Sequence, residues 1–236
     1  MKTVVVTGGT TRIGKAIAER LRTDGWRVLT SSHRADAGAD VVADLSDPMG
    51  PARLYAAVME SLGGRPPDAL VNNAALYVGD DAAIEAIDFI APKKLTMLMA
   101  GRETADRGSV VNILDTRVLN PVPPDAVLSP SSATGVGADG SETPPARALG
   151  GTAYARAKAA LLDYTRDSAA TFADTLRVNG VAPGPVLAPT QVHEKAGELL
   201  VDRPTAADVA AAVAYLLAAK STTGCVIPVD GGQWLT

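Results

Sequence analysis

A tyrosine and a lysine stand four residues apart in the stretch TAYARAKAAL, residues 152–161, which otherwise consists mostly of good helix formers. Residues i and i+4 lie on one face of a helix, so the side chains of Tyr154 and Lys158 can converge on one small volume. A phenol held beside an ammonium could donate a proton to a reacting carbonyl or imine. The same pair also fits an ordinary surface, because both side chains have apolar stems. The rest of the chain has to decide between the two interpretations.

Composition narrows the classes of function. The chain has 236 residues, 47% of them hydrophobic and 20% charged, which is typical of a globular protein and leads us to expect one catalytic domain over residues 1–236. A net charge of -4 argues against a positively charged surface that binds nucleic acid. No apolar run is long enough to span a membrane. The single cysteine, Cys225, and the absence of a signal-like start favour a cytoplasmic protein. His33 and His193 are isolated, so we expect no metal site.

Short β-branched runs alternate with longer segments rich in alanine and leucine. Such alternation predicts βαβ units with right-handed crossovers. The candidate strands are TVVVT, WRVLTSS, ADVVA, ALVNN, SVVNIL, TLRVNGVAP and CVIPVD. The sequence therefore predicts an α/β protein with a doubly wound Rossmann fold, a seven-stranded parallel sheet and helices on both faces. In such a fold the ligand site lies off the carboxyl ends of the strands.

A proline-rich segment at about 119–151 interrupts this alternation. It holds six of the chain's 16 prolines and joins the fifth predicted strand to the helix that carries Tyr154. Loops of this length are uncommon in compact domains. We interpret the segment as an inserted loop, either a lid over the expected site or an unstructured insertion.

The first predicted strand ends in TGGTTRIG, residues 7–14. Gly8 and Gly9 would form a tight turn and Gly14 would open a helix, so the backbone could approach a pyrophosphate closely. Glycine also ends strands for local reasons, but a place in the first strand-to-helix turn favours a dinucleotide.

The end of the second predicted strand indicates which dinucleotide. An NAD site would place an acidic residue there, whereas this chain has Ser32, His33 and Arg34. Arginine suits a 2′-phosphate, and Arg12 could add a second positive charge, so we predict NADP over NAD. The nearby Asp36 argues against this choice, because an acidic residue there favours NAD. Asp44, after the third strand, could meet an adenine edge or equally cap the next helix.

Five motifs in order, TGGTTRIG, NNAA at 72–75, YARAK at 154–158, RVNGVAPGPV at 177–186 and the ending IPVDGGQWL, resemble the short-chain dehydrogenase/reductase family. Arg12 stands where the family usually has the middle glycine of its turn, and Asp115 stands where a serine usually ends the fifth strand. Both changes resemble the pteridine reductase branch, which uses NADPH. A third departure places Asp88 where many members have a helix asparagine.

The resemblance implies roles for individual residues. Lys158 would hold the nicotinamide ribose and lower the pKa of Tyr154, Asn72 would support the nicotinamide through backbone and amide contacts, and Pro183-Gly184 with Val186 would pack on that ring. The catalytic residues expected are Tyr154, Lys158 and Asp115. The residues expected to bind NADP are Gly8, Thr10, Arg12, Ile13, Gly14, His33, Arg34, Asp44, Leu45, Asn72, Ala74, Tyr154, Lys158, Pro183, Gly184 and Val186.

Asp115 leaves several alternatives open. By number alone Ser141 falls at the usual distance before the tyrosine, but the strand alignment favours Asp115. An ionised carboxylate only accepts hydrogen bonds and favours a substrate with N–H groups, whereas a protonated one could donate to a ketone. Asp115 could also be a cap or turn residue outside the pocket.

We therefore predict an NADPH-dependent oxidoreductase that transfers hydride to a C=N or C=O bond of a small pterin-like or other heterocyclic substrate, with Tyr154 as proton donor. The alternatives are a carbonyl reductase or alcohol dehydrogenase of specialised metabolism, and a dinucleotide-binding sensor without turnover. The family commonly forms homodimers or homotetramers. The stretch AIDFIAPKKLTMLMA, residues 86–100, could serve such a contact or an internal core equally well.

Overall fold

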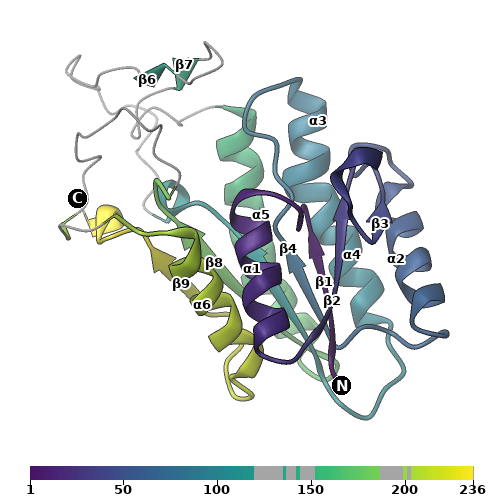
Figure 1. Ribbon diagram of the computed structural model, residues 1–236. Coiled ribbons are helices and arrows are strands. Elements are labelled where there is room, and N and C mark those ends of the chain that lie inside the picture. Colours follow the sequence, from purple (N-terminus) through teal and green to yellow (C-terminus); the bar gives the residue numbers. More distant parts are fainter. Residues whose placement is uncertain (120–134, 137–141, 144–151, 187–198, 201–202, 236) are drawn as a thin grey trace.

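The computed structural model describes residues 1–119, 135–136, 142–143, 152–186, 199–200 and 203–235. Its main feature is one seven-stranded sheet with the strand order β3-β2-β1-β4-β5-β8-β9 (Figure 1). Every neighbouring pair in this sheet is parallel. The predicted doubly wound sheet is therefore confirmed. The strand order reverses between β1 and β4, which is where such folds bind their ligands.

The seven strands coincide with the β-branched runs of the sequence. Their bounds are β1 (Thr3–Thr7), β2 (Arg27–Ser32), β3 (Val41–Val42), β4 (Ala69–Asn72), β5 (Gly108–Ile113), β8 (Leu176–Pro183) and β9 (Val226–Val229). All residues of β1, β4, β5 and β8 are buried, as expected for central parallel strands that are covered on both faces. A separate antiparallel pair consists of β6 (Gly135–Val136) and β7 (Glu142–Thr143).

The remaining part of the predicted insertion, at about 119–151, falls outside the described residues, as do Ser141 and His193. The choice between a lid and an unstructured insertion therefore stays open.

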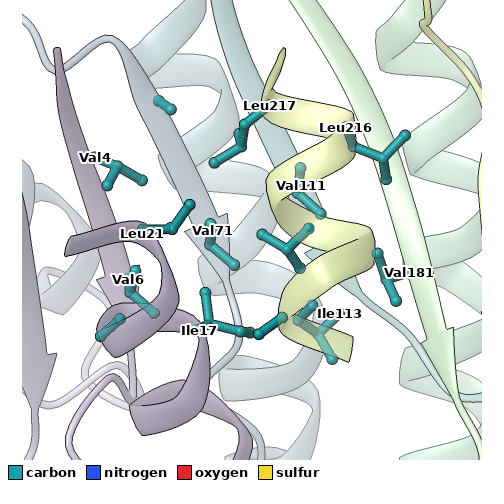
Figure 2. Packing of buried hydrophobic residues seen from close by; sticks show 14 of the residues in the cluster. Val4, Val6, Ile17, Leu21, Val71, Val111, Ile113, Val181, Leu216 and Leu217 are labelled. Atoms are coloured by element: carbon teal, nitrogen blue, oxygen red, sulfur yellow. The ribbon is translucent and has the colours of Figure 1, made fainter. Parts of the chain in front are cut away.

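Helices cover both faces of the large sheet. Helix α1 (Arg12–Thr23) and helix α6 (Ala206–Ala218) pack on one face, where Ile17 and Leu21 meet Val4, Val6 and other strand side chains (Figures 1 and 2). Figure 2 shows Leu216 and Leu217 of α6 in the same cluster, beside Val111 and Val181. The interleaved strand residues point the other way. They pack with helices α2 (Gly50–Ser61), α4 (Ala91–Ala100) and α5 (Ala153–Thr171).

The segment that ends in α4 is not one regular α-helix. It consists of α3 (Asp81–Glu85), a π-helical turn η2 (Ala86–Ile90) and α4. In the π-helical turn the Ala91 N–H donates to the carbonyl of Ala86, five residues earlier. Pro92 supplies the physical reason, since it has no N–H to donate to the carbonyl of Asp88, four residues before it. The turn is wider than an α-helical one and carries Asp88 to the inside, where it is fully buried.

Two 3₁₀ turns lie near the carboxyl ends of the strands: η3 (Thr116–Val118) directly follows β5, and η4 (Gln233–Leu235) follows β9. A third, η1 (Ala35–Ala37), follows β2. Within the part of the chain that the structure describes, no helix is long and apolar enough to cross a membrane. No group of three or more metal-binding side chains occurs among those residues either.

Candidate active site

The glycines in the turn after β1 have no side chains, so they leave space in which a phosphate group could lie close to the backbone. Gly8 has a φ of 61°, a left-handed conformation that suits glycine. A Cβ at Gly14 would lie 2.2 Å from the Gly8 carbonyl oxygen and 2.4 Å from Asn73 Nδ2, so no other residue fits there unless the turn moves. At the start of α1, Thr11 makes no side-chain capping bond. The first N–H groups of this helix are therefore left to a ligand or to water, and an anion is favoured there.

Hydrogen bonds from β4 hold this turn in place. Thr7 Oγ1 accepts from the backbone N–H groups of Asn73 and Ala74 at 2.9 and 3.0 Å. Asn73 Nδ2 donates to the carbonyl oxygens of Thr7 and Gly8 at 2.9 and 3.2 Å. Ala74, one of the predicted cofactor-binding residues, thus lies directly beside the turn. These bonds fix the conformation of the turn.

Arg12 occupies a left-handed conformation with a φ of 49°, the only positive φ of a non-glycine residue among the described residues. This conformation costs a residue with a side chain about 1–2 kcal/mol and explains why glycine suits the position. The Arg12 side chain is exposed, and Thr10 is half-buried beside it. Ile13 points the other way and packs against the core around α1 and α6.

The end of β2 carries the polar residues that the sequence predicted for a 2′-phosphate. His33 and Arg34 are exposed, and Ser32 Oγ accepts from the Arg34 N–H at 3.1 Å. The Arg34 guanidinium is already paired with Asp36, through contacts of 2.9 and 2.6 Å. This pairing lowers the pKa of the Asp36 carboxyl. A phosphate would therefore have to share Arg34 with Asp36 or displace it.

The two residues after β3 that were expected to contact the cofactor, Asp44 and Leu45, make their contacts within the protein. Asp44 Oδ1 accepts from the backbone N–H and the hydroxyl of Ser46, at 2.9 and 2.7 Å, and these bonds lower the Asp44 pKa. The alternative of a helix cap is wrong, because α2 begins after Met49 without a side-chain cap. Leu45 is buried in the core against α2, so its side chain does not face a ligand. Contacts of Asp44 and Leu45 with an adenine stay a prediction.

Asn72 is placed differently from the expectation. Its side chain is 2% exposed and donates to Asn112 Oδ1 on β5 at 2.8 Å. Asn112 in turn donates to Thr165 Oγ1 on α5 at 2.9 Å, so the two amides tie β4, β5 and α5 together. This corrects the expected amide contact to the nicotinamide: the Asn72 Nδ2 group is used inside the sheet. Asn73, not singled out by the sequence, is the asparagine that supports the cofactor turn.

The structure brings Tyr154, Lys158 and Asp115 together. Tyr154 and Lys158 share one face of α5, and Asp115 follows β5. The Tyr154 hydroxyl donates to Asp115 Oδ2 at 3.2 Å, and the Lys158 Nζ lies 5.6 Å from the centre of the Tyr154 ring. Lys158 donates to the carbonyl of Ile113 at 2.9 Å. All three side chains are buried and lie at the carboxyl edge of the sheet, as the fold predicts.

Arg117, two residues after Asp115, pairs with that carboxylate through two nitrogens of its guanidinium. Its Nε lies 2.8 Å from Oδ1 and its terminal nitrogen lies 2.6 Å from Oδ2, a bidentate pair. The Arg117 backbone N–H also donates to Oδ1. Asp115 thus caps the η3 turn and also contacts the phenol of Tyr154. Bidentate pairing of this kind is the interaction of an ionised carboxylate, which accepts hydrogen bonds and cannot donate.

Tyr77 completes the wall of the site. Its ring meets that of Tyr154 edge to face, with centroids 4.9 Å apart. The Arg117 guanidinium lies 5.5 Å from the centre of the Tyr77 ring and donates to its hydroxyl at 3.3 Å. Tyr77, Tyr154, Asp115 and Arg117 therefore form one connected cluster from three segments of the chain.

The electrostatics of Tyr154 differ from the expectation. Burial raises the pKa of its phenol well above the usual value, and the negative charges of Asp115 and Asp88 raise it further, against a smaller opposing effect of Arg117. The predicted lowering of this pKa is therefore wrong: the pKa of Tyr154 is raised. Lys158 Nζ lies 3.0 Å from Asp88 Oδ1, which balances its positive charge. The phenol therefore keeps its proton through the neutral range.

The segment after β8 closes the site on another side. Gly184 donates to the carbonyl of Val229 at 2.9 Å and approaches Asp230 so closely that a Cβ would lie 2.7 Å from the Asp230 Cβ. Pro183 is the buried last residue of β8, and Val186 packs partly on the core around α1. Asp230 accepts from the Thr116 hydroxyl and from the Trp234 N–H, which ties η3 to η4. Packing of Pro183, Gly184 and Val186 on a nicotinamide stays a prediction.

Comparisons with known proteins agree with this geometry. A family model described as enoyl-(acyl carrier protein) reductase matches residues 146–233. The granaticin polyketide synthase putative ketoacyl reductase 2 of Streptomyces violaceoruber is 31% identical over 98% of this chain and 95% of its own length. Pteridine reductase 1 of Leishmania tarentolae is 26% identical over 98% of this chain and 96% of its own.

A solved structure is similar over the whole chain. It is FolM alternative dihydrofolate reductase 1 from Brucella canis in complex with NADP, with a TM-score of 0.77 and 29% identity over 100% of this chain and 95% of that one. The fold, the ordered motifs and these relatives place the chain in one class: it belongs to the short-chain dehydrogenase/reductase family of oxidoreductases.

Proposed function

We propose that this protein is an NADPH-dependent reductase that transfers hydride to a C=N or C=O bond of a small heterocyclic substrate with N–H groups, such as a pterin. The observation that carries this proposal is the contact between the Tyr154 hydroxyl and an Asp115 carboxylate that is paired bidentately with Arg117. The described residues would act within one catalytic domain. The similarity to pteridine reductase 1 and to the NADP complex of FolM supports the same class of substrate and cofactor.

The residues around the first glycine turn fit NADPH. The turn at Gly8 and Gly14 and the uncapped start of α1 suit a pyrophosphate, and Arg12 with His33 and Arg34 offers positive or donor groups for a 2′-phosphate. The Lys158 ammonium has three N–H donors, of which one bonds to Ile113 and one faces Asp88. The third could hold a ribose hydroxyl. When bound, NADPH supplies the hydride.

Tyr154 would supply the proton. Its hydroxyl donates to Asp115 Oδ2, so it would have to turn from this oxygen toward the substrate. That movement frees one acceptor position on Asp115, because the other contacts of the carboxylate are made by Arg117. One substrate N–H can occupy the freed position. Asp115 and Tyr154 together would thus bind a group in which a hydrogen-bond donor lies next to the atom that takes up the proton.

The raised pKa of Tyr154 favours reduction over oxidation. A phenol that keeps its proton through the neutral range is ready to act as an acid, whereas oxidation of an alcohol or amine needs it as a base. Tyr77 lies against the Tyr154 ring and would offer an aromatic surface to a planar substrate.

A ketone reductase is the second candidate, supported by the similarity to a putative ketoacyl reductase. For this reaction Asp115 would have to release Arg117 and become protonated, or make no contact with the substrate, because an ionised carboxylate repels a carbonyl oxygen. A dinucleotide-binding sensor is the third alternative. Its binding function would not require the buried proton donor at Tyr154.

The test is NADPH oxidation, followed by absorbance, with a dihydropterin and with a control lacking substrate. Steady turnover that Asp115→Ala abolishes, while NADPH affinity is retained, would support the pterin-like substrate. Turnover only with ketones would move the assignment to carbonyl reduction. NADPH binding without turnover on any imine or ketone would favour the sensor.

A further inference from the structure

Asp230 is a buried carboxylate that has no part in the proton transfer proposed above. It directly follows β9 and is 3% exposed. The ion pairs among the described residues do not include it. Three hydrogen-bond donors converge on it instead: the N–H of Gly232 at 2.9 Å, the N–H of Trp234 at 2.8 Å and the hydroxyl of Thr116. Burial of a polar group without such partners is costly, so these bonds fix the carboxylate in one place.

Thr116 carries this contact to the candidate active site. It is the first residue of η3 and is 2% exposed. Its chain neighbours are Asp115, which contacts the phenol of the proposed proton donor, and Arg117, which pairs with Asp115. At the other end of η3, Val118 packs into the apolar cluster between α5 and β8. The bond from Thr116 to Asp230 is therefore the polar anchor of η3, beside an apolar anchor at Val118.

Asp230 also borders the turn that follows β8. A Cβ added to Gly184 would lie 2.7 Å from the Asp230 Cβ and 2.9 Å from its Cα, so the two residues are in close contact. The Gly184 N–H donates to the Val229 carbonyl at 2.9 Å, which holds this turn beside β9. The turn, Pro183-Gly184, is the one predicted to pack on the nicotinamide. Asp230 thus lies between the segment that carries Asp115 and the segment expected beside the cofactor.

We propose that Asp230 is a positioning residue that sets the place of η3 relative to the Pro183-Gly184 turn. Through the Thr116 hydroxyl it holds Asp115 at a fixed distance from the cofactor side of the site. A substrate bound to Asp115 then presents its reacting carbon to the nicotinamide. The proposal rests on the proposed function in this last step, whereas the contact that holds η3 does not depend on the substrate.

The test is the Thr116→Val variant, which keeps the shape of the side chain and removes the hydroxyl. Thr116→Ser is the conservative variant and keeps the hydroxyl. Thr96→Val is the matched control, because Thr96 is 0% exposed and its hydroxyl donates to the Pro92 carbonyl within α4 at 2.8 Å. All three changes are made at buried threonines, but only Thr116→Val removes the contact to Asp230.

Amide hydrogen exchange of the full chain, followed by mass spectrometry, is the first readout. We expect the N–H groups of residues 117–119 to exchange about tenfold faster in Thr116→Val than in the parent, because η3 loses a buried hydrogen bond to a carboxylate. Thr116→Ser and Thr96→Val should exchange at the rate of the parent in this segment. Equal exchange of η3 in Thr116→Val and Thr96→Val would overturn the proposal, whatever the substrate proves to be.

Turnover is the second readout and separates positioning from a purely structural contact. We expect kcat with a dihydropterin to fall by about 10- to 100-fold in Thr116→Val, with an unchanged NADPH dissociation constant, because a misplacement of about 1 Å can cost about 100-fold. Thr116→Ser should restore kcat. Faster exchange of η3 with the kcat of the parent would overturn the proposal. Faster exchange in a protein whose parent does not reduce the pterin would uphold the contact that holds η3 and reject only the substrate.

A double variant identifies Asp230 as the partner of Thr116. Thr116→Val combined with Asp230→Asn should lower kcat/KM no further than Asp230→Asn alone, because both changes disrupt the same contact. Additive losses would overturn the proposal. If Asp230→Asn does not fold, Thr116→Val still gives both readouts, since it leaves the carboxylate in place. Loss of folding in Thr116→Val itself, followed by circular dichroism, would show that the contact holds the fold rather than the site, and would also overturn the proposal.

Discussion

The bidentate pair of Arg117 and Asp115 makes a prediction with an internal control. Arg34 and Asp36 form a pair with the same two-residue separation and closely similar contacts, 2.9 and 2.6 Å against 2.8 and 2.6 Å. The two pairs differ in exposure: the side chains of Arg117 and Asp115 are 22% and 10% exposed, those of Arg34 and Asp36 64% and 70%. Burial, together with the contacts of Arg117 to Tyr77 and of Asp115 to Tyr154, should therefore set the difference in energy between them.

Breaking a fully buried pair costs about 3–5 kcal/mol, and exposed pairs contribute about 0–1 kcal/mol. The partial exposure of Arg117 leads us to expect about 2 kcal/mol for Arg117→Met, or a fall in Tm of about 4–8 °C for a domain of this size. The assay is a double-mutant cycle of Arg117→Met and Asp115→Asn, read by urea unfolding. The same cycle on Arg34 and Asp36 should give a clearly smaller coupling energy. Equal coupling in the two cycles would refute the argument that Arg117 locks the Asp115 carboxylate.

Two further predictions concern the turn and the proton donor. Gly14→Ala should lower the free energy of unfolding by about 1–3 kcal/mol and weaken NADPH binding, because the new Cβ would press on the Gly8 carbonyl. Gly101→Ala is the control and should change neither quantity, because the nearest atom to its new Cβ is 3.7 Å away. Urea unfolding and NADPH titration measure the two effects. Because burial and Asp115 raise the Tyr154 pKa, reductase activity should not decline from loss of the phenol proton until the pH is above the usual range for a phenol, and Asp115→Asn should move that decline to lower pH. A pH profile of kcat that is unchanged in Asp115→Asn would contradict the second prediction.

The fold could be predicted from the sequence because its signals are local and repeated. β-Branched runs such as TVVVT and SVVNIL became the central strands, and the glycine turn lies directly after β1. The convergence of Tyr154, Lys158 and Asp115 followed from parallel strands whose carboxyl ends share one edge. Pro92 in the sequence is the signal that could have indicated the π-helical turn before α4.

The partners of the site residues could not be predicted, because they come from side chains that meet only in the folded chain. Arg117 lies only two residues after Asp115, but nothing in the spacing shows that it pairs with that carboxylate. The balance of charge around Tyr154 depends on Asp88, which the π-helical turn brings to Lys158. The different places of the two asparagines in NNAA have a similar reason. Strand alternation directs the Asn72 side chain into the sheet and leaves the Asn73 side chain at the turn after β1.

The central claim is that Tyr154 donates the proton in an NADPH-dependent reduction, and one measurement tests it most directly. Steady-state NADPH oxidation with a dihydropterin should be compared between the parent and Tyr154→Phe, together with the NADPH dissociation constant of each. The account predicts a fall in kcat of at least about 100-fold with an unchanged dissociation constant, since general acid catalysis contributes about 10²–10⁴-fold. A Tyr154→Phe variant that turns over at the rate of the parent would contradict it.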